Sequence, residues 1–365
     1  SIINNKDRIK DFKVEISNKN YALVQNLRQT RLEDYILHEH NGPKINYKKK
    51  FPVKVSYNNK ETKAKLKLFG YVYDHFRNPK KFSFRLKYNG DTGFGKKQVN
   101  LANVRHSHYV TDFLSNNLYN QIFKGIKIKF EPVRLTLNKM DFGYYFVEDF
   151  LDKYLIEDNS FREGLIFELY SDSIHYNHND LRFSKISSFL DHIISSDDKA
   201  LINYFDIEKT FGYIAILALA NDPHPNIFGN FKCYFNPVTN KIEPLISEIN
   251  FIPIQEPINL RQLKEHNHTI ANPLLKLFVE SYDQDNFNKL IIDAMLKIEQ
   301  NLSPIIGSDE YKNFTESLYG YKNQIKSKEE IILNNMKILK NNLINNYERH
   351  SDLYHSKVII FDNFW

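Results

Sequence analysis

Four side chains that could handle a metal-bound phosphate gather in one short stretch of the sequence, residues 221–251. His224 and Asn230 stand in a polar loop, and Glu248 and Asn250 follow the second of two short predicted strands. Strand ends and the loop before them can converge, so these side chains could form one cluster. A metal-bound phosphate requires carboxylate and amide oxygens beside a proton acceptor. The stretch therefore predicts a site for phosphate chemistry.

Each residue of this stretch has a role that its chemistry suggests. His224 could accept a proton from a substrate hydroxyl, because an unperturbed imidazole titrates near neutral pH. Asp222 competes for that role, although an Asp before a proline also caps turns. Glu248 is the first candidate for a metal ligand. Asn230 offers a metal-binding amide, and Asn250 follows as a third oxygen donor.

A second group of charged residues belongs to the clearest predicted strand, residues 81–88. Apolar side chains alternate there with Lys81, Ser83, Arg85 and Lys87, so these polar residues are expected on one strand face. Such cations could hold the phosphates of a ligand, or they could belong to a solvent-exposed strand. The sequence leaves both possibilities open.

The elements that must position these residues change along the chain from β to α. Between residues 10 and 90, alternating apolar residues predict strands with one helix among them. A helix at about 107–123 and a hairpin at 133–148 follow. After Asp149 helical periodicity dominates, and the capping box at 327–330 predicts the start of the last long helix. The pattern predicts an α+β fold.

Composition limits the classes of partner. Fifty Lys and Arg against 44 Asp and Glu give a net charge of +6, which suits an anionic ligand such as a nucleotide. No basic helix or stacking platform indicates nucleic-acid binding. Cys233 is the only cysteine, which excludes an internal disulfide and a cysteine-based metal site. No apolar run approaches the ~18 residues of a membrane span.

Several short motifs follow one another as they do in the CotH kinase-like family, which this chain resembles between about residues 12 and 255. In that family a strand ending in glycine leads to an Asp-His pair and a Lys-x-Ser-x-Arg strand. The corresponding segments here are residues 64–70, Asp74-His75 and 81–85. The other similar segments are Gly95 to Lys97 with Leu101 and Arg105, Asn138 to Glu148, Glu163-Gly164, His224, Asn230, Tyr234 to Thr239 and Glu243-Pro244.

The resemblance implies a protein-kinase-like fold of two lobes. Residues 1–148 would form the N-terminal part and a β-rich N-lobe, and 149–348 a mainly helical C-lobe that carries the catalytic-type hairpin 221–251. Residues 349–365 would be a tail or the start of a truncated further element. ATP and Mg²⁺ would bind between the lobes, and phosphate would pass to a hydroxyl of a protein or glycan.

The resemblance also implies roles for single residues. A cation of the 81–88 strand, Arg85, Lys87 or Lys81, would neutralise nucleotide phosphates, and Glu148 would line the nucleotide site near the ribose or adenine. His224 or Asp222 would orient the acceptor hydroxyl. The metal would be held by Asn230, Glu248 and Asn250.

The chain also departs from better-known members of the family. They carry a Trp-Asp-x-Asp segment where this chain has Ser247 to Asn250, and the longer arm and lost charge weaken a metal site. A catalytically impaired pseudokinase and a structural or adhesive envelope protein without phosphotransfer are the alternatives. Family members often act at the cell envelope or outside it, while the cytoplasm stays open for this chain. Neither the acceptor nor the oligomeric state follows from the sequence.

Overall fold

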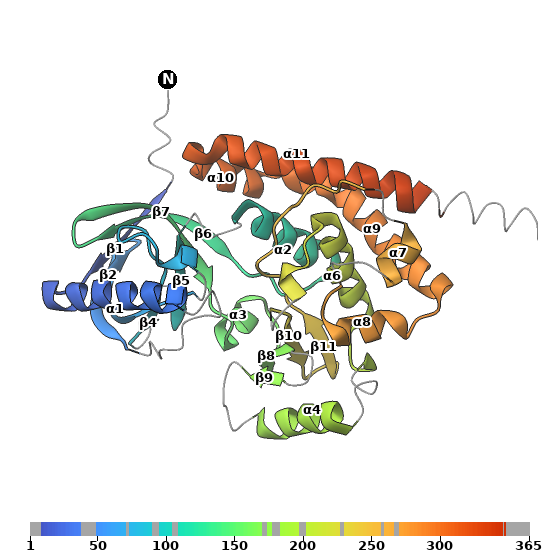
Figure 1. Ribbon diagram of the computed structural model, residues 1–365, viewed down its shortest axis with the longest axis horizontal. Helices are drawn as coiled ribbons and strands as arrows, with labels where there is room; N and C mark the ends of the chain where they lie inside the picture. The colour runs from blue at the N-terminus through green and yellow to red at the C-terminus, as the bar shows by residue number, and fades with distance from the viewer. Residues whose placement is uncertain are drawn as a thin grey trace, which may run out of the picture. The chain divides into compact units, whose positions relative to one another are not determined.

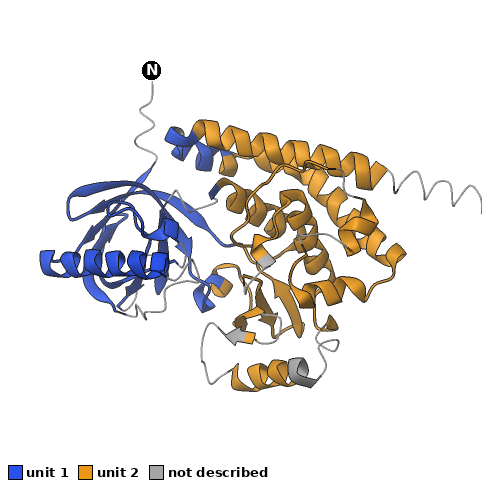
Figure 2. Cartoon of the chain, in the orientation of Figure 1, with its two compact units in different colours: residues 1–109, 128–155, 312–321 blue, residues 110–127, 156–311, 322–365 orange. Residues whose placement is uncertain are grey.

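The chain is a mixed α+β protein with an N-terminal barrel of strands followed by a mainly helical part with a small sheet (Figure 1). This computed structural model describes residues 9–37, 49–70, 73–89, 95–103, 109–169, 174–176, 183–196, 202–226, 230–256, 259–265, 270–345 and 347. Figure 2 distinguishes two compact units. Unit 1 comprises residues 1–109, 128–155 and 312–321, and unit 2 comprises 110–127, 156–311 and 322–365.

Within the described part of unit 1, seven strands close into a barrel in the order β1-β2-β3-β4-β5-β7-β6. β1 pairs in parallel with β6, and the other neighbours are antiparallel. Alternate side chains point inward and form one apolar core. The strands are β1 (Lys10–Glu15), β2 (Phe51–Tyr57), β3 (Lys60–Leu68), β4 (Phe84–Tyr88), β5 (Gln98–Asn103), β6 (Phe130–Leu137) and β7 (Met140–Asp149).

Two barrel hairpins turn at residue pairs with left-handed backbone, which suits the twist of the flanking strands. Asn58 and Asn59 have φ of 49° and 58°, and Asn138 and Lys139 have φ of 47° and 66°. The Asn138 side chain also accepts a hydrogen bond of 2.8 Å from the backbone of Ile16, which ties the turn to the end of β1. The predicted 133–148 hairpin is confirmed.

Unit 2 contains a sheet in the order β11-β10-β8-β9 and a buried helix, α6. Every residue of α6 from Thr210 to Ala220 is buried, and α6 packs against α9, α11 and β11. The strands of this sheet are β8 (Leu165–Leu169), β9 (Ile174–Tyr176), β10 (Lys232–Asn236) and β11 (Lys241–Pro244).

The helices of the chain follow mainly after residue 149, as predicted. No helix in the part of the chain described is long and apolar enough to cross a membrane. The helices are α1 (Asn18–Leu37), α2 (Tyr109–Phe123), α3 (Lys153–Asp158), α4 (Ser184–Ser196), α6 (Ile207–Ala220), α7 (Leu260–Glu265), α8 (Pro273–Glu280), α9 (Gln284–Ile306), α10 (Asp309–Ser317) and α11 (Lys322–Leu339).

The predicted start of the last long helix was wrong. α11 begins at Lys322, directly after a single 3₁₀ turn at Tyr319–Tyr321, so the predicted capping box at 327–330 lies inside the helix. Ile325 is buried, and this apolar contact stabilises the first turn of α11. The helix therefore starts before the capping pattern. Residues 349–365 lie outside the described part of the chain.

Candidate functional site

The polar loop of the predicted site starts where α6 ends. Asn221 adopts the left-handed conformation (φ 55°), and its backbone N–H donates to the carbonyl of Leu217, a common helix ending. Asp222 follows and is 4% exposed. Its Oδ1 accepts from the N–H of His224 at 3.0 Å, and its Oδ2 accepts from the N–H of Asn250 at 2.8 Å. Asp222 therefore has the geometry of a turn cap and fastens the loop to the segment after β11.

The β10–β11 hairpin returns the chain to the same place. Asn236 closes the turn by accepting from the N–H of Val238 at 3.0 Å, and the two strands pair from Asn236–Lys241 back to Cys233–Pro244. Beyond β11 the N–H of Leu245 donates to the carbonyl of Lys232 at 2.8 Å. Residues 247–251 thus pass beside the start of β10, and the polar loop lies opposite.

Glu248 lies between two cationic side chains. Its Oε1 is 2.7 Å from the Nζ of Lys232, and its Oε2 is 3.5 Å from the Nε2 of His224. Lys232 also donates to the Oγ of Ser247 at 3.2 Å. The Lys232 side chain is only 11% exposed, whereas those of Glu248 and His224 are 42% and 49% exposed. The ammonium group is therefore the best-shielded member of the cluster.

The electrostatics favour the charged form of both partners. The charge of Lys232 is the main cause that holds the pKa of Glu248 well below its usual range, and His224 adds to it. The hydrogen bond to Glu248 raises the pKa of His224, against a smaller opposing effect of burial. A raised imidazole pKa favours the protonated ring, which cannot accept a proton.

Asn230 and Asn250 lie on either side of this pair. The Nδ2 of Asn230 donates to the carbonyl of His224 at 3.1 Å and lies 3.4 Å from the Nε2 of the same ring. The Oδ1 of Asn250 accepts from the Nζ of Lys328 at 2.7 Å, and Lys328 also donates to the carbonyl of Phe251 at 3.0 Å. Burial lowers the pKa of Lys328, while the charge of Asp222 raises it.

Two residues of the cluster, Lys232 and Lys328, were not predicted from the sequence. Lys232 stands in a strand where alternation alone shows no chemistry. Lys328 belongs to α11 and meets Asn250 across 78 residues of sequence. Only the packing of α11 brings its ammonium group to the cluster, so no local signal could have identified it.

Two of the three predicted metal ligands, Glu248 and Asn250, contact cationic side chains. Mg²⁺ needs oxygen ligands in near-octahedral order. Both oxygens of Glu248 face cationic side chains, and the side-chain oxygen of Asn250 accepts from Lys328. Among the described residues no group of three or more His, Cys, Asp and Glu could hold a metal ion. The ammonium groups of Lys232 and Lys328 thus contact two of the predicted metal ligands.

In unit 1, Arg85 and Glu148 are linked through one amide. The guanidinium of Arg85 donates to the Oδ1 of Asn100 at 2.7 Å, and the Nδ2 of Asn100 donates to Glu148 at 3.4 Å. Arg85 is also stacked on Phe150 and Phe69, 4.3 Å and 5.0 Å from the ring centroids. Burial lowers the pKa of Arg85 to about 10, which leaves it charged at neutral pH. Its planar group is thus held by aromatic rings.

The predicted strand at 81–88, with Lys81, Ser83, Arg85 and Lys87 on one face, begins later in the structure than expected. β4 starts at Phe84, so Lys81 precedes it and forms an isolated bridge with Asn78. Ser83 is buried, and its Oγ accepts from the N–H of Asn103 at 3.1 Å. Within β4, Arg85 is half-buried and Lys87 is exposed.

The predicted site residues therefore fall into two groups. Unit 2 contains His224, Asp222, Asn230, Glu248 and Asn250, which do converge, and unit 1 contains Lys81, Arg85, Lys87 and Glu148. No protein-family model matches the sequence, and no curated protein is significantly similar to it. Function must therefore be inferred from the residues and their contacts.

Proposed function

We propose that this chain is a pseudokinase similar to the CotH family, which binds a nucleotide polyphosphate without a metal ion and does not transfer phosphate. Units 1 and 2 would correspond to the β-rich and helical lobes of a protein-kinase-like fold. The observation that carries the proposal is the contact of Lys232 with Glu248 and of Lys328 with Asn250, each at 2.7 Å.

The charge balance of the cluster supports an anionic ligand. A divalent ion would have to displace two ammonium groups, one of which is well shielded from solvent. A polyphosphate can instead accept charge-assisted hydrogen bonds from those groups. Lys232, Lys328 and a protonated His224 outnumber the carboxylates of Glu248 and Asp222. The cluster then offers a phosphate the positive charge that Mg²⁺ supplies in an active kinase.

The two candidate proton acceptors support binding without transfer. Both carboxylate oxygens of Asp222 accept backbone N–H groups, and the group is buried. The contact with Glu248 favours the protonated ring of His224. A general base must be free to take a proton at the operating pH. Asp222 is held as a turn cap, and the contact of His224 with Glu248 favours the form of the ring that cannot accept a proton.

An active atypical kinase is the competing proposal. It would use ATP and Mg²⁺ to phosphorylate a hydroxyl of a protein or glycan. The observation in its favour is the convergence of His224, Asn230 and Glu248 around one point of unit 2. In that case Lys232 and Lys328 would have to move onto the bound nucleotide. Glu248 and Asn250 would then be free to bind the metal.

Thermal unfolding and calorimetric titration with ATP, in EDTA and in excess Mg²⁺, separate these proposals. We expect ATP to raise the melting temperature in EDTA as much as in Mg²⁺, and no labelled phosphate to reach the protein or added acceptors. Lys328→Met should weaken binding about tenfold, because a charge-assisted hydrogen bond is lost. Lys337→Met, an exposed lysine of the same helix, is the matched control.

Four results would argue against the pseudokinase. Binding that requires Mg²⁺, or label transfer that His224→Ala abolishes, would favour the active kinase. The absence of any ATP binding would contradict both and favour a structural or adhesive protein. Equal loss of affinity in Lys328→Met and Lys337→Met would place the nucleotide away from the cluster.

A further inference from the structure

Glu248 has a backbone conformation that its residue type disfavours. Its φ is 61°, in the left-handed region where a side chain with a Cβ costs roughly 1–2 kcal/mol. Such a conformation persists only where neighbouring contacts enforce it. The following residue, Ile249, is held through both of its backbone polar groups. The N–H of Ile249 donates to the Oδ1 of Asp112 at 2.8 Å, and its carbonyl accepts from the Oγ1 of Thr111.

Thr111 and Asp112 both lie in the first turn of α2 and are 1% and 5% exposed. A carboxylate in the first turn of a helix is favoured by the helix dipole, so burying Asp112 there is less costly than elsewhere. Its partner Ile249 is fully buried and lies 137 residues away in sequence. α2 therefore fixes the peptide that directly follows Glu248.

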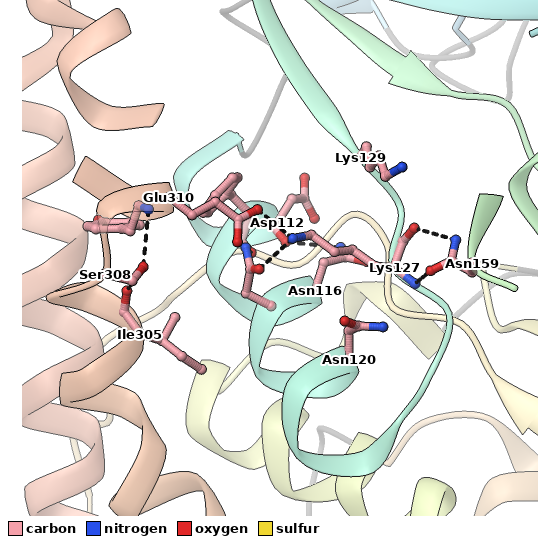
Figure 3. A network of polar contacts seen from close by, with 12 residues as sticks. Asp112, Asn116, Asn120, Lys127, Lys129, Asn159, Ile305, Ser308 and Glu310 are labelled. Carbon is pink, nitrogen blue, oxygen red and sulfur yellow. Dashed lines mark hydrogen bonds and ion pairs between the residues drawn. The ribbon is translucent and has the colours of Figure 1, made fainter. Parts of the chain in front are cut away.

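α2 is itself anchored inside unit 2. The Nζ of Lys127 lies 2.6 Å from the Oδ1 of Asn117 and 2.6 Å from the Oε1 of Glu310. The hydroxyl of Tyr119 donates to the carbonyl of Pro244 at 2.9 Å. Figure 3 shows Lys127 between Glu310 and Asn159, with Asp112 and Asn116 of α2 near Glu310. A helix with both ends fastened can act as a rigid support for a site.

We propose that Asp112 is a positioning residue, which together with Thr111 holds Glu248 in its left-handed conformation and so aims its carboxylate at His224 and Lys232. The inference rests on the proposed function in one respect: it treats the cluster around Glu248 as the site that binds the ligand. The contacts themselves involve no ligand. Loss of the clamp would let the peptide of Ile249 rotate, and Glu248 would relax toward an ordinary φ and leave its partners.

The test compares Asp112→Ala and Thr111→Val with the conservative variants Asp112→Asn and Thr111→Ser. The ring-nitrogen chemical shifts of His224, measured by NMR at one fixed pH, report whether Glu248 still contacts the imidazole. Glu248→Gln gives the spectrum of a ring without its charged partner. We expect Asp112→Ala to move the shifts most of the way to that reference and Thr111→Val to move them part of the way.

Rescue by the conservative variants identifies positioning. Asn keeps an oxygen that can accept from Ile249, and Ser keeps the hydroxyl, so both should retain the wild-type spectrum. The proposal is overturned if Asp112→Ala or Thr111→Val folds, by circular dichroism, yet leaves the His224 shifts unchanged. If Asp112→Ala does not fold, Thr111→Val decides, since it removes one hydrogen bond at nearly constant volume. These outcomes do not depend on ATP binding, so failure of the proposed function leaves them interpretable.

Discussion

The carboxylate of Glu248 meets two cations of different character. Lys232 approaches from within the strand and is nearly shielded from water, whereas His224 approaches from a loop and is half exposed. An ion pair gains more when solvent does not screen it, so Lys232 is the main partner of Glu248. The exposed imidazole adds a smaller contribution that depends on its protonation.

We expect the pKa of His224, followed by NMR titration, to lie above its ordinary value of about 6.5. In Glu248→Gln it should fall, because the negative partner is lost. Since the folded-state pKa is raised, the stabilisation is fully present below the ordinary value and is lost as the pH rises through the folded-state pKa. The contribution of this half-exposed pair should be less than about 1 kcal/mol.

A shift of the His224 titration in Asn230→Ala as large as in Glu248→Gln would contradict this explanation. Asn230 contacts the same ring but carries no charge. It should therefore change the titration much less than the loss of the carboxylate.

At the scale of elements, α6 and α2 approach each other closely at Gly212. Gly212 of α6 faces Phe123 of α2, and a Cβ on Gly212 would be 2.5 Å from the ring. Only glycine permits this approach. Asp112 of α2 and Asp222, which follows α6, both accept hydrogen bonds from the segment around Ile249. The contact at Gly212 therefore joins the two helices that lie next to this segment.

We expect Gly212→Ala to destabilise the protein by about 1–3 kcal/mol, because the added methyl group overlaps a buried aromatic ring. Urea unfolding followed by circular dichroism measures the change. Gly307→Ala is the control, because Gly307 has helical φ and ψ of −77° and −9° and meets no ring. It should change the stability by less than about 1 kcal/mol. Equal effects of the two substitutions would rule out the packing explanation.

At the scale of the whole molecule, the chain passes repeatedly from one unit to the other. Unit 1 is built from three segments of sequence, and its last segment, 312–321, is more than 150 residues beyond the others. Phe314 packs on Phe146, and Tyr321 packs edge-on against Tyr144 and Tyr109. The barrel unit therefore includes aromatic contacts from the C-terminal third of the chain.

A fragment of residues 1–155 should consequently be less stable than unit 1 in the intact chain. It lacks residues 312–321, and it exposes the buried face of α2, which belongs to unit 2. We expect a lower melting temperature and binding of a hydrophobic dye. Phe314→Ala in the intact chain tests the aromatic contact alone and should also lower the melting temperature. A fragment that melts as cooperatively and as high as the intact chain would refute the prediction.

Local patterns were sufficient for much of the fold and for part of the site. Alternation predicted strands between residues 10 and 90, and the 133–148 hairpin was also predicted, because these features depend on neighbours in sequence. β5 and the closure of the strands into a barrel were not predicted. The polar loop and the strand ends of 221–251 were correctly expected to bring His224, Asn230 and Glu248 together. Alternation did not show that β4 begins only at Phe84 or that Ser83 contacts the distant Asn103.

The residue types of the site and their approximate convergence were thus already present in the amino-acid sequence. The partners of those residues were decided by tertiary structure. Lys328 reaches Asn250 from α11, and Asp112 reaches Ile249 from α2, across 78 and 137 residues. Contacts of such separation depend on how helices pack and not on any local periodicity. That packing placed ammonium groups beside the expected metal ligands.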